Sequence, residues 1–146
     1  MLANYVTKEA IVVNEKLRNW KEVVLLSGQL LEDTNKIKKS YKQAMIENIK
    51  THGPYIVIAS GLAIPHARPK DGVKENGVSI LTLQEPVQFG HPKYDPVDII
   101  VSFAALDDSK HTELMDQLAE FLSYKQNLEQ LRAAKDKKEV LSLIKV

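Results

Sequence analysis

Two histidines, His66 and His111, have the sequence surroundings of residues that carry chemistry. Imidazole is the only side chain whose unperturbed pKa lies near neutrality, so it can act as a nucleophile, a base or an anion ligand at neutral pH. His66 follows Pro65, whose ring fixes its own backbone angle and favours an extended conformation at Ile64. A stiff strand end, with Arg68 two residues later, is typical of a nucleophile or base at the rim of the core. A polar residue at a strand exit is the alternative interpretation.

His111 lies in the first turn of an expected helix and shares its apolar stripe. It precedes Leu114 and Met115 by three and four residues and Leu118 by seven, so its ring should point over the edge of the sheet. Free N–H groups and the positive end of the helix dipole favour an anion at this position. We therefore expect both rings to meet around one anion. The alternative is a buried structural histidine bonded to a carboxylate.

The other histidines and the serines indicate different chemistry or none. We interpret His52 as a surface residue at a helix end and His91 as a solvent-exposed residue of a proline-rich loop. A Ser-His-Asp hydrolase using Ser60 or Ser102 remains an alternative, although no GxSxG motif occurs. A zinc site of the two motif histidines and a carboxylate is disfavoured because neither HExxH nor HxH occurs. No Walker or GxGxxG loop indicates nucleotide binding.

Helical periodicity and capping residues place helices on both sides of the first motif. Asn19 predicts the start of a helix over about 20–32, and Thr34 is expected to cap a second helix that Gly53 and Pro54 end. A strongly amphipathic helix over 111–122 follows the capping residues 107–109. Two short helices near 126–133 and 136–144 close the chain.

Apolar runs predict the strands, which are expected at 11–13, 55–59, 78–83 and 97–104, with Leu62 resuming an extended segment. The run over 97–104 is almost continuously apolar, which is typical of a strand covered on both faces. The expected architecture is therefore an α/β three-layer sandwich with a central mixed β-sheet of about five strands, flanked by helices on both faces.

Length and composition exclude several classes of protein. The 146 residues suit one domain, and the absence of cysteine excludes a disulfide framework, a thiolate metal site and a cysteine nucleophile. A formal net charge of +1 argues against a generic binder of nucleic acid or anionic membranes. The chain has neither an apolar run long enough to span a membrane nor an apolar signal segment, so we expect no membrane insertion and a cytoplasmic location.

Two segments carry a resemblance to a known family. SGLAIPHARPKDGV resembles the active-site signature of mannitol/fructose-type enzyme IIA proteins of the bacterial phosphoenolpyruvate-dependent sugar phosphotransferase system, and SFAALDDSKHTELMDQLAEFL resembles the segment with the family's second histidine. The resemblance covers nearly the whole chain and implies a single enzyme IIA domain of type 2 over residues 1–146. It implies that His66 is phosphorylated and that His111 supports the phosphoryl group.

One position departs from the family pattern. Many members carry a phosphate-binding arginine near the end of the second helix, where the stretch AMIENIK has Asn48. An amide can donate a hydrogen bond to phosphate but cannot neutralise its charge. Arg68, inside the PHARP stretch, is expected to bind the phosphoryl group from the other side, together with Asn48.

The resemblance also implies a function and partners. The donor would be a phosphohistidine of the carrier protein HPr, and the acceptor a cysteine of enzyme IIB, which acts with the membrane permease enzyme IIC. No metal or cofactor is implied, and no particular oligomeric state. The PHARP stretch, with GPYIVIASG before it, is most similar to the ascorbate branch, so L-ascorbate is the expected sugar.

Other functions remain open within and near this family. They are a nitrogen-type regulatory phosphoprotein that moves no sugar, an enzyme IIA for a pentitol, hexitol or fructose, and an accessory domain of a transcriptional regulator. We expect a free-standing protein rather than the last of these, because the chain has a start methionine and a C-terminal helix.

Overall fold

A mixed sheet of five strands forms the centre of the molecule, which the structure, a computed structural model, describes over residues 1–145. The strands are β1 (Ile11–Glu15), β2 (Val57–Ala59), β3 (Leu62–Ala63), β4 (Gly77–Val87) and β5 (Val97–Ala104). Their order across the sheet is β1-β4-β5-β3-β2. The pairs β1/β4 and β3/β5 are parallel, and the pairs β4/β5 and β2/β3 are antiparallel. The expected mixed sheet is confirmed.

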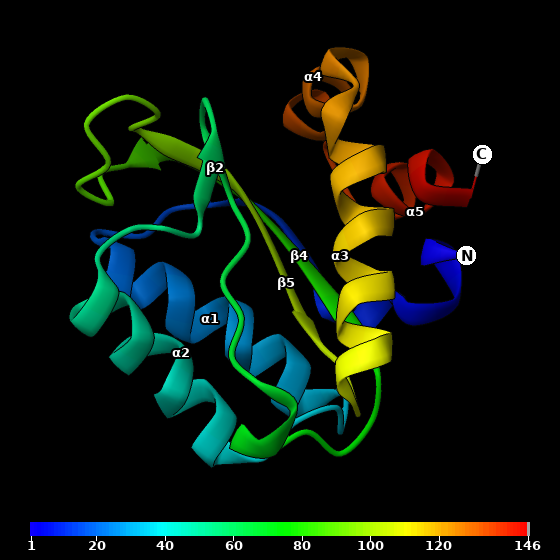
Figure 1. The fold of residues 1–146 in the computed structure, drawn as a ribbon. Helices are drawn as coiled ribbons and strands as arrows, with labels where there is room; N and C mark the ends of the chain where they lie inside the picture. The colour runs from blue at the N-terminus through cyan, green and yellow to red at the C-terminus, as the bar shows by residue number, and fades with distance from the viewer. Residues whose placement is uncertain (146) are drawn as a thin grey trace.

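Helices cover both faces of this sheet. They are α1 (Trp20–Asp33), α2 (Lys39–His52), α3 (Asp108–Ser123), α4 (Lys125–Ala133) and α5 (Lys137–Lys145), together with the 3-10 turns Leu2–Tyr5, Lys8–Ala10 and Pro69–Asp71. Figure 1 shows α1 and α2 on one side of β4 and β5, with α3, α5 and the N-terminal turn on the other. Two apolar clusters fill the two spaces between these layers. The predicted three-layer sandwich is therefore confirmed.

Strand β5 lies between the two apolar clusters. Its side chains alternate, so that Ile100 packs towards the α1 and α2 layer while Ile99 and Phe103 pack into the cluster that includes α3. All three side chains are fully buried, as expected for a strand covered on both faces. The carboxyl end of β5 thereby delivers Phe103 to the region where His66 and His111 lie.

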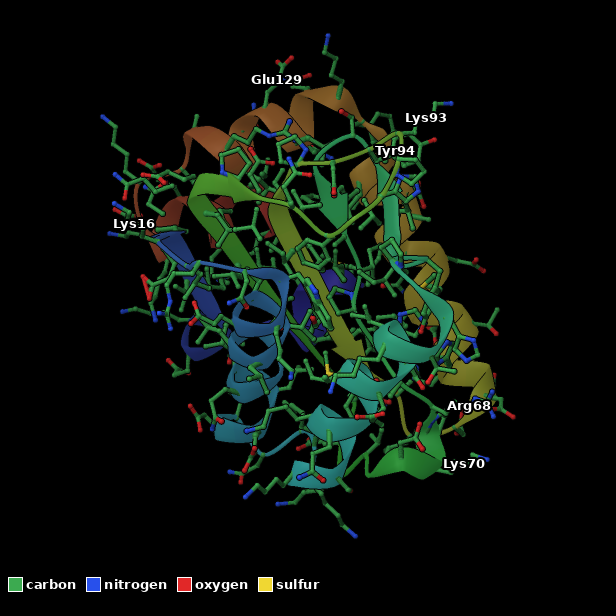
Figure 2. All side chains as sticks on the ribbon, turned by 90° about the vertical axis from the view of Figure 1, so that its left-hand side faces the viewer. Lys16, Arg68, Lys70, Lys93, Tyr94 and Glu129 are labelled. Atoms are coloured by element: carbon green, nitrogen blue, oxygen red, sulfur yellow. The ribbon has the colours of Figure 1, made fainter. Side chains whose placement is uncertain are left out.

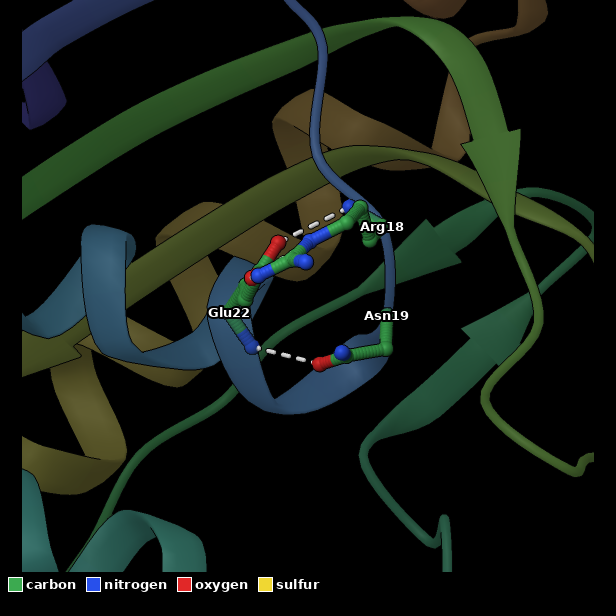
Figure 3. Close-up of polar contacts among 3 residues, drawn as sticks. All are labelled: Arg18, Asn19 and Glu22. Atoms are coloured by element: carbon green, nitrogen blue, oxygen red, sulfur yellow. Dashed lines mark hydrogen bonds and ion pairs between the residues drawn. The ribbon is translucent and has the colours of Figure 1, made fainter.

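The predicted start of α1 is confirmed at Asn19. The Asn19 side chain accepts a hydrogen bond from the Glu22 backbone N–H at 3.0 Å. The Glu22 carboxylate in turn accepts from the Arg18 backbone N–H at 2.9 Å and pairs with the Arg18 guanidinium at 2.6 Å (Figure 3). The bond to Asn19 satisfies a backbone N–H that the first helical turn would leave without a partner, and the Arg18 contacts hold the segment before the helix.

Helix α2 begins later than expected, and the assignment of Thr34 as its N-cap is wrong. The Thr34 hydroxyl donates to the Leu30 carbonyl oxygen at 2.7 Å and so closes the end of α1 instead. Helix α2 starts at Lys39. Between the two helices, Ile37 is buried and pairs with Val73 in an isolated antiparallel bridge.

Strand β2 is shorter than expected because the chain turns before it. Gly53 ends α2 with a φ of +80°, a conformation that favours glycine. The Tyr55 N–H then bonds to the Gly53 carbonyl oxygen at 2.9 Å, and the strand begins only at Val57. Tyr55, expected in the strand, consequently lies in a turn and is 45% exposed.

Strand β4 continues beyond its expected end and includes Pro86. Its pairing with β5 is irregular between Thr82 and Val87. At Val87 the two strands pair again. This irregularity accommodates a residue that has no N–H to donate to a neighbouring strand.

Candidate active site

The two motif histidines open into one cavity of about 320 Å³. Its walls come from the end of α2, the turn before β2, the segment after β3 and the first turn of α3. The lining residues are Asn48, His52, Tyr55, His66, Ala67, Arg68 and His111. The four site residues predicted from the sequence, His66, His111, Arg68 and Asn48, are therefore brought together.

The His66 imidazole is held by its own backbone segment and by an aromatic ring. Its Nδ1 lies 2.8 Å from the Ile64 carbonyl oxygen. Because a carbonyl can only accept, Nδ1 carries the hydrogen and Nε2 has the free lone pair. Ile64 is buried, and the Phe103 ring stacks on the imidazole with a centroid distance of 4.9 Å. Backbone and core together fix both the tautomer and the plane of the ring.

The environment of His66 also favours the neutral imidazole. Burial lowers the pKa of His66 below its ordinary value of 6.5, because a charged ring loses hydration there. The bond to Ile64 acts in the opposite direction, and the positive charge that His111 can carry lowers the pKa further. The ring is thus neutral at pH 7, which is the protonation state that a nitrogen nucleophile needs.

His111 lies beside His66, in the first turn of α3. The two ring centroids are 5.4 Å apart with an angle of 68° between the planes, and the His111 ring also packs edge-on against Phe103 at 5.0 Å. The expected meeting of the two rings is therefore found. Within residues 1–145 the His111 ring forms no ion pair with a carboxylate, the arrangement that a purely structural role suggested.

The N-terminus of α3 is partly satisfied by its own cap. The Asp107 carboxylate accepts a hydrogen bond from the Lys110 N–H at 2.8 Å. The sequence suggested that the free N–H groups of this helix end would bind an anion. Because the Asp107 carboxylate already accepts from one of them, fewer N–H donors remain for an anion in the cavity than expected. The His111 side chain is then the main contribution of α3 to the cavity.

Arg68 and Asn48 both line the cavity. Arg68 is exposed, and its backbone N–H bonds to the Asp71 carboxylate at 2.8 Å, which fixes the segment after His66. Figure 2 shows Arg68 and Lys70 on the same edge of the molecule. In the described part of the chain the Arg68 guanidinium has no ion-pair partner, so it is available to an anion. Asn48 is half-buried on α2.

Three further lining residues, His52, Tyr55 and Ala67, were not predicted from the sequence as site residues, and two of them are aromatic. Tyr55 packs edge-on against His66 at a centroid distance of 6.4 Å, and His52 packs against Tyr55 at 6.1 Å. Burial raises the pKa of the Tyr55 hydroxyl, while the nearby Arg68 charge and the Asn48 amide oppose that effect. The useful sequence signal was the Gly53-Pro54 turn, which separates Tyr55 from the strand and folds it back over the end of α2.

Other candidates lie outside this cavity. The Ser102 hydroxyl, proposed as an alternative nucleophile, is fully buried and donates to the Ser27 hydroxyl at 2.9 Å. Ser60 lies in the turn between β2 and β3 and is not among the cavity residues. His91 is half-buried rather than exposed, because its Nδ1 accepts the Lys93 N–H at 3.1 Å and the Tyr94 N–H at 3.0 Å. The structure therefore gives neither serine a histidine partner in the cavity.

A hollow larger than the histidine cavity lies elsewhere. It measures about 1130 Å³ and lies between the N-terminal turn, α3, α4 and α5. Its lining contains no histidine and no arginine, so its size does not make it the chemical site.

Residues 1–145 show neither a metal-binding cluster nor a membrane-spanning helix. No group of three or more histidine, cysteine, aspartate or glutamate side chains is arranged there to hold a metal ion. The helices of this part of the chain are all too short or too polar to cross a membrane.

Comparison with known proteins gives the class to which this fold and cavity belong. The family model of the phosphoenolpyruvate-dependent sugar phosphotransferase system, EIIA 2, matches residues 4–146. The chain belongs to this family. It is therefore a component of a sugar phosphotransferase system and a phosphocarrier of sugar uptake.

Individual relatives show which members of the family the chain resembles. The chain is 38% identical over 137 residues to the ascorbate-specific PTS system EIIA component of Escherichia coli K12, covering 93% of this chain and 89% of that one. It superposes on the mannitol-specific cryptic phosphotransferase enzyme IIA CmtB of Escherichia coli with a TM-score of 0.90 at 31% identity, covering 98% and 97% of the two chains. A PTS IIA (PtxA) of Streptococcus mutans gives a TM-score of 0.86 at 32% identity, covering 94% and 88%.

Proposed function

We propose that His66 accepts a phosphoryl group from the phosphohistidine of HPr and passes it to a cysteine of enzyme IIB. Enzyme IIB and the permease enzyme IIC would then use it in the uptake and phosphorylation of L-ascorbate. The observation that carries the proposal is the neutral His66 imidazole, whose Nδ1 is bonded to the Ile64 carbonyl oxygen and whose Nε2 lone pair is free.

The acceptor step requires alignment more than acid or base catalysis. The Nε2 lone pair attacks phosphorus as the bond between phosphorus and the donor nitrogen breaks, in a loose transition state that is roughly in line. No proton has to leave Nε2 before the attack, because the ring hydrogen is already on Nδ1. Stacking on Phe103 and the bond to Ile64 hold the ring still, which is the positioning that such a transfer needs.

The phosphoryl oxygens on His66 would meet three polar side chains of the cavity. His111 stands next to His66, and Arg68 and Asn48 line the same cavity. Arg68 supplies a charge-assisted contact, whereas Asn48 supplies a neutral one. Among residues 1–145 the cavity has a single guanidinium, so we expect moderate binding of a phosphoryl group that must move on.

The second transfer needs a partner because the sequence contains no cysteine. The open cavity suits access by two proteins in turn, and interfaces of such relays are small and short-lived. A cytoplasmic location follows from this role, in which HPr and enzyme IIB are both met in solution. Several relatives named as ascorbate-specific support L-ascorbate as the sugar.

The test of the acceptor is incubation with phosphoenolpyruvate, enzyme I and HPr, followed by mapping of the labelled histidine. We expect one phosphoryl group per chain, on His66, and none in His66→Ala. The control His91→Ala removes another half-buried histidine outside the cavity and should keep full labelling. Full labelling of folded His66→Ala would overturn the assignment of His66 as the phosphoryl acceptor.

The sugar is tested by reconstitution with ascorbate-specific enzymes IIB and IIC. Transport and phosphorylation of L-ascorbate, with no activity towards mannitol or fructose components, would support the proposal. A protein that is phosphorylated on His66 but passes the group to no sugar-specific enzyme IIB would instead be a regulatory phosphoprotein of the nitrogen type.

A further inference from the structure

A buried tyrosine of α2 connects two segments beneath the cavity. The Tyr41 side chain is fully buried, and its hydroxyl lies 2.7 Å from the Phe103 carbonyl oxygen and 2.9 Å from the Ala67 backbone nitrogen. The Ala67 carbonyl oxygen is more distant, at 3.2 Å. A hydroxyl has one hydrogen, so we assign the donated bond to Phe103 and the accepted bond to the Ala67 N–H.

Both bonded segments also position the His66 ring. Ala67 directly follows His66 in the chain, and the Phe103 ring stacks on the imidazole at 4.9 Å. Phe103 also contacts the His111 ring at 5.0 Å. One hydroxyl therefore joins α2 to the backbone beside the acceptor and to the strand residue that supports both histidines.

The hydroxyl has a role that the aromatic ring alone cannot fill. Ala67 is buried, so without Tyr41 its N–H would lose its hydrogen-bond acceptor inside the protein. The segment would then shift to reach water or another acceptor. Burial raises the pKa of the Tyr41 hydroxyl, so the group stays neutral and keeps its hydrogen for Phe103.

We propose that Tyr41 is a positioning residue for phosphoryl transfer, holding His66 in the attacking geometry through the Ala67 N–H and the Phe103 carbonyl. This inference rests on the proposed function of His66 as the phosphoryl acceptor. Tyr41 does not line the cavity, so its effect is transmitted through the backbone of the two bonded residues. Displacements of the order of 1 Å in reacting atoms are enough to slow a transfer strongly.

The variant that tests the proposal is Tyr41→Phe, which keeps the ring and removes only the hydroxyl. We expect the maximal rate of phosphorylation by phospho-HPr to fall about tenfold with little change in KM for HPr, because the donor surface is intact. The matched control is Thr82→Val, which removes another buried hydroxyl that accepts a backbone N–H, that of Asn14 at 2.9 Å. This control should lose stability but keep the wild-type rate.

Two further measurements separate positioning from general stabilisation. In Tyr41→Phe, the pKa of the His66 imidazole or the chemical shifts of its ring nitrogens should change. Thr82→Val should leave both unchanged. In the wild-type protein, the Ala67 amide should be protected from hydrogen exchange, which keeps a test available if Tyr41→Phe does not fold. An unprotected Ala67 amide, or equal rates and His66 resonances in Tyr41→Phe and wild type, would overturn the proposal. A wild-type protein that HPr does not phosphorylate would overturn the proposed function itself.

Discussion

The Nδ1 atom of His66 donates its hydrogen to the carbonyl oxygen of Ile64, two residues earlier in the chain, at 2.8 Å. Pro65 stands between them and restricts the backbone, so the bond is formed within a stiff tripeptide. A local bond of this kind selects one tautomer of the ring without help from a distant carboxylate. The short motif thus selects the tautomer of the acceptor histidine, while the Phe103 ring that stacks on the imidazole fixes its plane.

The first prediction concerns the site of the phosphorus–nitrogen bond. Because the Nδ1 hydrogen is engaged by Ile64, we expect phosphohistidine at Nε2 of His66. Phosphorus-31 and nitrogen-15 NMR of the phosphorylated protein distinguish the two isomers. Phosphorylation at Nδ1 would mean that the bond to Ile64 breaks before transfer, and it would contradict the proposal that Nε2 attacks.

The second prediction concerns the dependence of the reaction on pH. Burial lowers the pKa of His66 below 6.5, so the neutral nucleophile persists to lower pH than in an exposed histidine. The rate of phosphorylation at saturating donor should therefore decrease as pH falls through the lowered pKa of His66, at a lower pH than for an exposed histidine. Titration of the His66 resonances by NMR should give the same midpoint. A midpoint above 6.5 in both measurements would contradict the effect of burial.

Sequence patterns predicted the fold and the meeting of the His66 and His111 rings because the strands, the helices and the placement of each ring on its element depend on local spacing. The helical spacing of His111 from Leu114 and Leu118 is sufficient to put it on the inner face of α3. The Thr34 expectation failed because a threonine hydroxyl can close one helix by bonding a carbonyl four residues earlier as readily as it can start the next. A local pattern does not distinguish these two uses.

The parts of the site that could not be predicted are those formed between distant residues. Tyr41 meets Ala67 and Phe103 across 26 and 62 positions of the sequence, and no spacing rule connects them. In the sequence, a tyrosine on the buried face of a helix looks like packing alone. Likewise, the tautomer of His66 depends on the path of the backbone through Ile64, which becomes visible only in three dimensions.

The third prediction concerns His111. His111→Gln keeps a hydrogen-bond donor beside His66 but removes the ability to carry charge, so phosphorylation of His66 should persist while transfer to enzyme IIB slows about tenfold. Single-turnover transfer from the isolated phosphoprotein measures this step directly. Thr112→Ala, an exposed neighbour on α3, is the control for effects on the first turn of the helix and should transfer normally. Unchanged transfer in His111→Gln would make His111 a structural residue.

The last prediction separates Arg68 from the general positive charge around it. Arg68 lines the cavity and Lys70 does not, although both are exposed on the same short segment and at the same edge of the molecule (Figure 2). If the Arg68 guanidinium binds the phosphoryl oxygens in place of the family arginine, Arg68→Ala should slow phosphorylation of His66 about tenfold or more, and Lys70→Ala should have little effect.

The dependence on ionic strength distinguishes a contact with the phosphoryl group from a general attraction between the two proteins. A contact between a guanidinium and a phosphoryl group in a cavity is screened less than a long-range attraction between surfaces. The defect of Arg68→Ala should therefore persist at high ionic strength, while any small defect of Lys70→Ala should vanish as both proteins lose long-range steering. Equal defects in the two variants, both abolished by salt, would place Arg68 in the docking of HPr rather than at the phosphoryl group.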